Sequence, residues 1–178
     1  NRQAPTEQAL FDQLQGRQNA GTWLPHPAQF PLQSLRCGSA QGRLIGGNLA
    51  MIGSTLGTPW EIDTQNAILF VEDVGEAPYK IDRLLTQLRL AGKLRGVRGV
   101  LIGDFSDVSA ADSTPEQQAL DAGRLQRLWQ EFFVPLTVPV LAGWRSGHVD
   151  PNLTLPIGAI VTLDADRQGV RVEQTLVV

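Results

Sequence analysis

The chain has 178 residues, 42% of them hydrophobic. This length is enough for one domain with a hydrophobic core and short for two compact domains. The formal net charge is −3, and the 15 basic residues are scattered without a cluster that could follow a nucleic-acid backbone. No apolar run approaches the length of a membrane span, so we expect neither nucleic acid nor membrane as a partner.

The first part of the chain has the character of a connector. Residues 5–14 predict a short helix, opened by Pro and Thr and followed by a glycine that stops it. From Gly16 to Gly42 the composition shifts to Pro, Gly and Gln, which is typical of a segment that crosses a surface. The chain begins with neither Met nor an export leader, so we expect it to be a fragment of a longer polypeptide or a processed one.

Short elements follow the connector. Residues 35–37 predict a brief strand, and GRLIGGN at 42–48 predicts a strand that closes in a glycine turn. Asn48 is well placed to cap a helix over 49–55. Glycine turns before helices can bind phosphate, but no P-loop or dinucleotide fingerprint is present, so a turn with a helix cap is the favoured interpretation.

Strands and helices then alternate. Buried strands are expected over 67–73, 97–105 and 138–143, and the three- and four-residue spacing of apolar residues predicts helices over 79–91 and 115–133 between them. This order indicates parallel strands joined by right-handed crossovers.

The hydrophobic pattern changes in the C-terminal residues. Two alternating runs around Asp164 to Gly169 predict a hairpin within residues 155–178. The expected fold class is therefore α/β, with a mainly parallel sheet, crossover helices and a C-terminal hairpin.

Candidate catalytic residues come directly after two of the predicted strands. Glu72 and Asp73 end the 67–73 strand, and His148 follows the 138–143 strand. Parallel strands present their carboxyl ends at one edge of a sheet, so we expect the Glu72 carboxylate and the His148 imidazole to face one another within or near hydrogen-bond reach. Such a carboxylate fixes the tautomer of the histidine. The alternatives are a structural ion pair for Glu72, a solvated loop histidine for His148, and helix capping by Asp73 or Glu76.

The chain offers no convincing nucleophile. Ser146 lies two residues before His148 but has no G-x-S-x-G frame. The same frame is missing around the other serines considered, which are Ser39, Ser54, Ser106 and Ser109. His26, set between two prolines, is interpreted as part of the connector. A metal site built from Glu72, Asp73 and His148 lacks the usual paired-histidine spacing, and the single cysteine, Cys37, has no partner for a disulfide or a zinc site.

Three stretches carry a family resemblance. The chain closely resembles the C-terminal domain of the LD-carboxypeptidases, serine peptidases that trim peptidoglycan peptides, at GRLIGGNLAMIGSTLGTPW (42–60), ILFVEDVGEAPYKIDRLLTQLRLAGKLRGVRGVLIGDF (68–105) and GWRSGH (143–148). The motifs occur in the family's order and approximate spacing, and the microcin-immunity peptidases are relatives. The resemblance implies a swivelling β/β/α-type domain over 33–178, preceded by a connector helix and interdomain linker over 1–32.

The resemblance also implies a chemistry. Family members carry a Ser–Glu–His triad whose serine belongs to an N-terminal domain, and the matching glutamate and histidine here are Glu72 and His148. The implied reaction is release of the terminal D-alanine from cytoplasmic murein tetrapeptides, with no metal or cofactor. Arg145 is a candidate for binding a substrate carboxylate, and a surface salt bridge is the alternative.

Binding partners and alternative functions can also be named for the chain. The implied partners are the muropeptide, the protein's own N-terminal nucleophile domain and, as a further candidate, a second copy of the chain in a homodimer. The chain alone is expected to be inactive, and an apolar face around Trp60, Trp144 and the connector is expected to be exposed. The rival functions are a non-catalytic binding or regulatory domain and a phosphocarrier that uses His148, beside which Glu72 would be an awkward neighbour.

Overall fold

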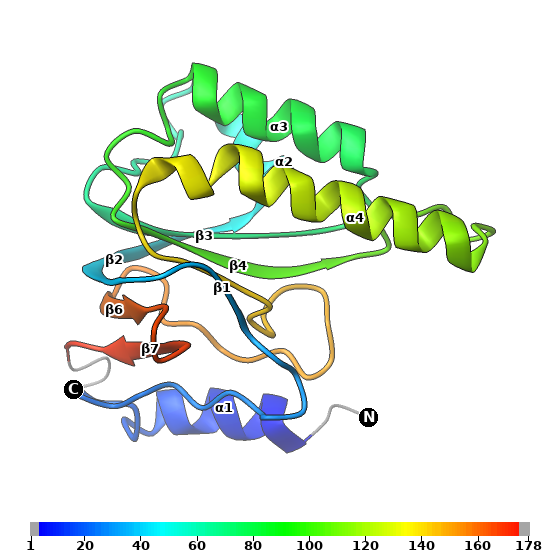
Figure 1. Ribbon diagram of the computed structural model, residues 1–178. Helices are drawn as coiled ribbons and strands as arrows, with labels where there is room; N and C mark the ends of the chain where they lie inside the picture. Colours follow the sequence, from blue (N-terminus) through cyan, green and yellow to red (C-terminus); the bar gives the residue numbers. More distant parts are fainter. Residues whose placement is uncertain (1–3, 175–178) are drawn as a thin grey trace.

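The structure, a computed structural model, describes residues 4–174, and within them seven strands form one mixed sheet (Figure 1). The order across the sheet is β1-β5-β4-β3-β2-β6-β7. The strands are β1 (Gln33–Arg36), β2 (Ser39–Asn48), β3 (Ala67–Val74), β4 (Gly99–Ser106), β5 (Val140–Ala142), β6 (Ile160–Asp164) and β7 (Gly169–Val172). The helices are α1 (Ala4–Leu14), α2 (Leu49–Thr55), α3 (Pro78–Leu90) and α4 (Pro115–Phe132), followed by the short 3-10 helix η1 (Val134–Leu136).

The sheet has a parallel centre and antiparallel edges. Strands β2, β3, β4 and β5 pair in parallel, whereas β1 runs antiparallel to β5 and the β6–β7 hairpin runs antiparallel to β2. The seven strands curl into a half-barrel with flanking helices. The predicted α/β class, with crossover helices and a C-terminal hairpin, is confirmed. The last residues of the predicted hairpin segment, 175–178, lie outside the described residues.

Apolar side chains pack on both faces of the sheet. Helices α2, α3 and α4 cover one face, and the predicted stripe of α3 lies within that core, with Ile81, Leu85 and Leu88 fully buried. The second core lies on the other face and includes Trp144 together with side chains of β6 and β7. The central strands are thus covered on both sides, which is the reason that β3 and β4 are continuous apolar runs.

Strand β2 differs from the sequence prediction. Instead of closing in a glycine turn, it continues through Gly46 and Gly47 to Asn48 and leads directly into α2. Both glycines have positive φ (+133° and +149°), and a Cβ on Gly46 would lie 1.8 Å from the carbonyl oxygen of Phe70. Gly46 is needed for the close approach of two strands, not for a reversal of the chain. The predicted cap is confirmed, because the Asn48 side chain accepts a hydrogen bond from the Met51 N–H at 3.0 Å.

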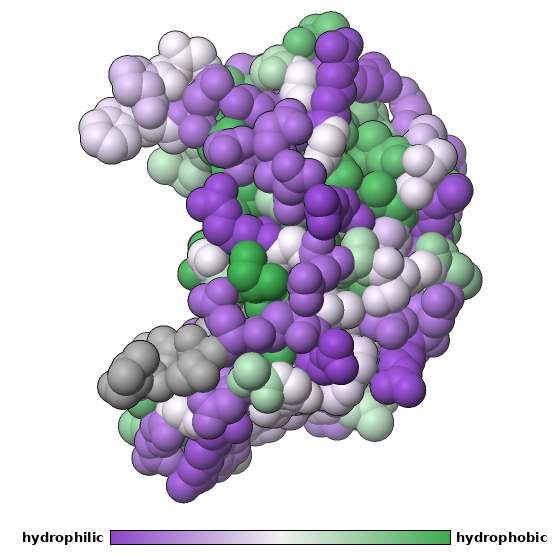
Figure 2. Space-filling model, turned by 90° about the vertical axis from the view of Figure 1, so that its left-hand side faces the viewer, coloured by the Kyte–Doolittle hydropathy of each residue, from purple (hydrophilic) through white to green (hydrophobic). Residues whose placement is uncertain are grey.

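The prediction of an exposed apolar face is wrong for Trp144. Trp60 is 85% exposed, but Trp144 is only 1% exposed and belongs to the second core. On the face drawn in Figure 2, polar side chains dominate and apolar ones appear in separate groups. Among the described residues, no helix is both long and apolar enough to cross a membrane.

Candidate active site

The predicted contact between Glu72 and His148 is present. Glu72 lies near the end of β3, and His148 lies in the loop of residues 143–148 that follows β5. Both strands flank β4 in parallel, so their carboxyl ends reach the same edge of the sheet. The Nδ1 atom of His148 lies 2.9 Å from Oε2 of Glu72. The expectation that the two side chains face one another is confirmed.

The two side chains differ in exposure. The Glu72 side chain is 7% exposed, whereas the His148 side chain is 55% exposed. When Nδ1–H donates to the carboxylate, the neutral ring carries its proton on Nδ1, and Nε2 is left as an acceptor. A buried acid thus orients an imidazole whose other nitrogen can take a proton from a reacting group.

The loop that carries His148 is shaped around Glu72. Gly147 has a φ of +126°, and a Cβ at this position would lie 2.5 Å from Oε2 of Glu72. The backbone N–H of Gly147 donates to the side-chain oxygen of Asn152 at 3.2 Å. Ser146 is buried and donates its hydroxyl proton to the carbonyl oxygen of Leu153, so it holds the loop.

Asp73 fastens the end of β3 to the start of α2. Its carboxylate accepts hydrogen bonds from the Asn48 side chain at 2.8 Å, from the Ala50 N–H at 2.9 Å and from the Val74 N–H at 2.9 Å. Capping was the expected role for an acid here, although the helix concerned is α2 and not the helix that follows in sequence. Glu76 pairs instead with Lys80, at 3.2 Å.

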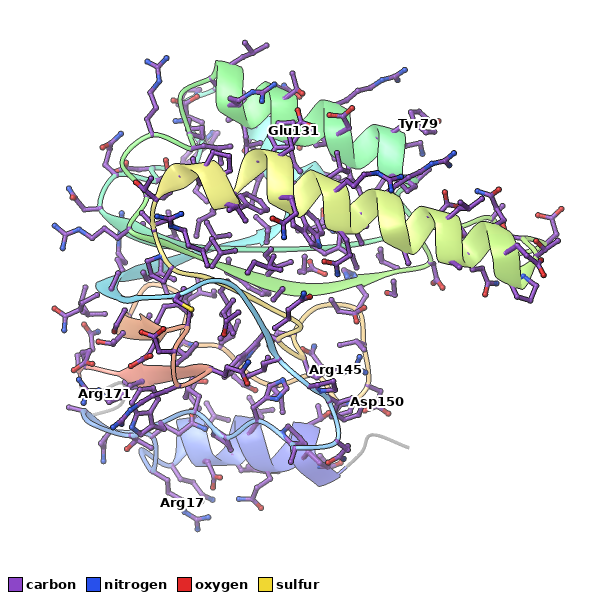
Figure 3. The ribbon with its side chains drawn as sticks, in the orientation of Figure 1. Arg17, Tyr79, Glu131, Arg145, Asp150 and Arg171 are labelled. Atoms are coloured by element: carbon purple, nitrogen blue, oxygen red, sulfur yellow. The ribbon has the colours of Figure 1, made fainter. Side chains whose placement is uncertain are left out.

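Arg145 is held by protein groups. Its Nη1 lies 3.3 Å from Oδ1 of Asp104, its Nη2 donates to the carbonyl oxygen of Asp150 at 2.8 Å, and its guanidinium lies 4.4 Å from the centroid of the Phe30 ring. Figure 3 shows Arg145 and Asp150 close together beside the end of α1. The salt bridge considered from the sequence is therefore present, with Asp104 as the partner.

A cleft of about 750 Å³ lies beside Glu72, and its lining includes Gly147 but not His148. Glu72 and the backbone of β2 form one wall, and the segment after Ser146 forms another. Helix α1 closes one side, because Thr6 accepts a hydrogen bond from the Asn152 N–H at 2.9 Å and lines the cleft with Leu10. Sites of this size suit a small molecule or a short peptide segment.

The protein-family model of the LD-carboxypeptidase C-terminal domain matches residues 41–163 of the sequence, a region that contains Glu72, Arg145 and His148. The chain belongs to the LD-carboxypeptidase family. Its membership agrees with the resemblance read from the sequence motifs.

Individual relatives support this membership. The chain is 38% identical over 143 residues to the probable murein peptide carboxypeptidase of Bacillus subtilis, covering 80% of this chain and 43% of that protein. It is 29% identical over 138 residues to the microcin C7 self-immunity protein MccF of Escherichia coli, covering 77% and 38%. The muramoyltetrapeptide carboxypeptidase of Oxalobacter formigenes superposes with a TM-score of 0.72 at 28% identity, covering 94% of this chain and 54% of that one. The chain thus spans less than half the length of the Bacillus subtilis and Escherichia coli relatives and about half of the Oxalobacter formigenes protein.

One residue of the connector contacts the loop of this LD-carboxypeptidase domain that carries His148, and the sequence did not predict this contact. His26 lies in the connector, its Nε2 accepts a hydrogen bond from the Arg145 N–H at 3.2 Å, and its ring centroid lies 4.9 Å from that of Trp144. The partners are 119 residues apart, and no local pattern connects them. Across residues 4–174, no group of three or more His, Cys, Asp or Glu side chains is arranged to hold a metal ion.

Gly147→Ala is expected to separate Glu72 from His148. The added methyl group would lie 2.5 Å from Oε2 and 3.0 Å from Cβ of Glu72, so that side chain must move, while the positive φ costs about 1–2 kcal/mol. A crystal structure of the variant should show the Nδ1 to Oε2 distance beyond hydrogen-bond reach. Gly158→Ala is the matched control, because Gly158 has a φ of +94° with open space around it. An unchanged Glu72–His148 contact in Gly147→Ala would contradict this expectation.

Proposed function

We propose that this chain is the C-terminal part of a serine LD-carboxypeptidase and supplies the glutamate and histidine of a Ser–Glu–His triad. The observation that carries the proposal is the 2.9 Å contact between the buried Glu72 carboxylate and the exposed His148 imidazole. Membership of the LD-carboxypeptidase family supports it. The serine would come from an N-terminal nucleophile domain, and we propose that domain as the partner of this chain. We also propose residues 1–32 as connector helix and linker, and 33–178 as the catalytic domain.

The proposed mechanism is acyl transfer. A serine hydroxyl attacks the amide carbonyl while Nε2 of His148 takes the hydroxyl proton, and His148 later gives that proton to the leaving amine. Glu72 accepts the Nδ1–H throughout, which holds the ring in the productive tautomer and stabilises the imidazolium that forms. A water molecule then hydrolyses the acyl-enzyme by the same route.

The proposed substrate is a cytoplasmic murein tetrapeptide, from which the terminal D-alanine is released. The names of the relatives support this choice, since one is a probable murein peptide carboxypeptidase and another a muramoyltetrapeptide carboxypeptidase. The cleft beside Glu72 has room for the end of a short peptide. Arg145 stays a candidate for contacting a substrate carboxylate, which would have to bind alongside Asp104 or replace it.

The chain alone should release no D-alanine from a murein tetrapeptide, because covalent catalysis needs the missing serine. Joined to the nucleophile domain of a relative, it should turn over. D-alanine release measured by a coupled amino-acid oxidase assay checks both statements, and a fusion that carries Ser→Ala in the nucleophile domain is the control. Robust serine-type cleavage by the 178 residues alone would refute the assignment.

A non-catalytic peptide-binding or regulatory domain is the second candidate. This function requires no nucleophile in the chain, which is consistent with residues 4–174, where no serine hydroxyl hydrogen-bonds to the imidazole of His148 and Ser106 donates to the His148 carbonyl oxygen at 3.4 Å. Calorimetry with a murein tetrapeptide separates the two functions. Binding without D-alanine release, even after the nucleophile domain is supplied, would favour the binding domain.

A further inference from the structure

The connector lies directly on the loop that carries His148. His26 and Phe30 of the connector contact two successive residues of the loop, with the His26 ring against Trp144 and the Phe30 ring against the guanidinium of Arg145. A Cβ on Gly143 would lie 3.0 Å from the carbonyl oxygen of Pro31, so the two backbones also run close together there. Residues far apart in sequence therefore form one packed unit around residues 143–148.

His26 makes a directional contact in this unit. Its Nε2 accepts the hydrogen bond of the Arg145 N–H at 3.2 Å, three residues before His148. Prolines on either side of His26 restrict the backbone that presents the ring, because each fixes its own φ and Pro27 also restricts His26. Trp144 is 1% exposed, so the His26 ring packs against a residue of the buried core.

We propose that His26 is a positioning residue that holds the 143–148 loop in the conformation in which His148 meets Glu72. The inference rests on the proposed function of that pair, but it concerns a different residue from a different segment. His26 is not among the residues that line the cleft, and it contacts Trp144 and the Arg145 backbone. It acts through the backbone of Arg145.

The contact requires a neutral imidazole, because a protonated ring has no acceptor nitrogen. Burial lowers the pKa of His26, the positive charge of Arg145 lowers it further, and a hydrogen bond with the Gly143 backbone opposes them. Arg145 is itself paired with Asp104. Because the pKa of His26 is lowered by folding, the His26 ring binds its proton at a higher pH in the unfolded chain than in the folded chain. The stability contributed by neutral His26 is present above the ordinary pKa of 6.5 and declines as pH falls below it.

The chain contains two histidines, so the test can be read without ambiguity. Long-range ¹H–¹⁵N spectra of the 178-residue chain in mildly alkaline buffer report the tautomer of each ring, and any His26 variant leaves only the His148 signals. In the wild-type chain we expect the Nδ1–H tautomer for His148. His26→Phe keeps a ring without an acceptor and should convert His148 to a mixture of tautomers with a weakened Nδ1–H resonance.

Two further variants separate positioning from packing. His26→Gln places an amide oxygen as many bonds from Cβ as Nε2 is, so it should restore the wild-type His148 signals. His26→Leu is a second variant without an acceptor and should behave like His26→Phe. If His148 keeps its wild-type tautomer in both His26→Phe and His26→Leu, the inference is overturned. A Gln variant that behaves like Phe and Leu would also overturn it, since packing alone would then explain the effect.

Glu72→Gln distinguishes failure of this inference from failure of the proposed function. If Glu72→Gln leaves the His148 tautomer unchanged, the pair itself is not coupled and the proposed function loses its support. If Glu72→Gln changes the tautomer but the His26 variants do not, only the inference fails. Should the His26 variants not fold, hydrogen exchange of the wild-type Arg145 amide decides. Protection well above that of the exposed loop amides supports the contact, and exchange as fast as theirs overturns the proposal.

Discussion

Glu72→Gln is expected to lower kcat for D-alanine release by about 10³–10⁴-fold, with little change in KM, when the chain is joined to a nucleophile domain. The glutamine amide can donate a hydrogen bond to Nδ1, which would favour the tautomer with the proton on Nε2. That tautomer cannot accept the serine proton, and the neutral amide no longer stabilises an imidazolium. Because Glu72 is nearly buried, solvent cannot take over its role.

Glu76→Gln is the matched control for this substitution. Glu76 lies in the loop after the same strand, but it pairs with Lys80 at the surface, and its change should leave kcat within about twofold because exposed pairs contribute little. Steady-state kinetics on the two fusions, with circular dichroism to confirm folding, make the comparison. Equal kcat values for Glu72→Gln and the unmodified fusion would remove Glu72 from the mechanism.

Gly46→Ala is expected to destabilise the domain by about 3–5 kcal/mol. A methyl group here would lie 1.8 Å from the Phe70 carbonyl oxygen and 2.9 Å from the Phe70 nitrogen, and both atoms belong to the backbone of the central strand β3. Neither can move without breaking the ladder between β2 and β3. The φ of +133° adds strain for any residue with a Cβ.

Gly47→Ala separates the clash from the strain. Gly47 has a φ of +149° with open space around its Cβ position, so its substitution should cost about 1–2 kcal/mol. Urea unfolding of both variants gives their free energies of unfolding, which can be compared when the dependence on urea concentration (the m-value) is the same for both. A Gly46→Ala variant as stable as Gly47→Ala would mean that β2 and β3 are not as close as the structure has them.

Much of the fold could be predicted from local patterns. The apolar run of β3, the stripe of α3 and the Asn48 cap are each encoded within a few residues, because strand periodicity, helix periodicity and capping are short-range properties. The Glu72–His148 contact could also be predicted, although 76 residues separate the two. The carboxyl ends of parallel strands meet at one edge whatever the loops between them do.

Other features needed the tertiary structure. Two glycines in a row suggest a turn, and only the neighbouring Phe70 backbone explains why they continue a strand. The sequence predicts an exposed apolar face that includes Trp144, yet this side chain is 1% exposed and the His26 ring of the connector lies against it. Asp73 reaches a helix that precedes it in sequence, not the helix that follows.

The sequence by itself therefore determined the order and type of the elements and the edge at which the acid and the histidine meet. The tertiary structure decided which distant segments pack together, namely the connector against the 143–148 loop and β2 against β3 at Gly46. The physical reason is the distance along the chain over which each kind of interaction acts. Backbone propensity and hydrophobic periodicity act between near neighbours, whereas close contacts between distant segments depend on the order of strands in the sheet and on how each loop crosses it.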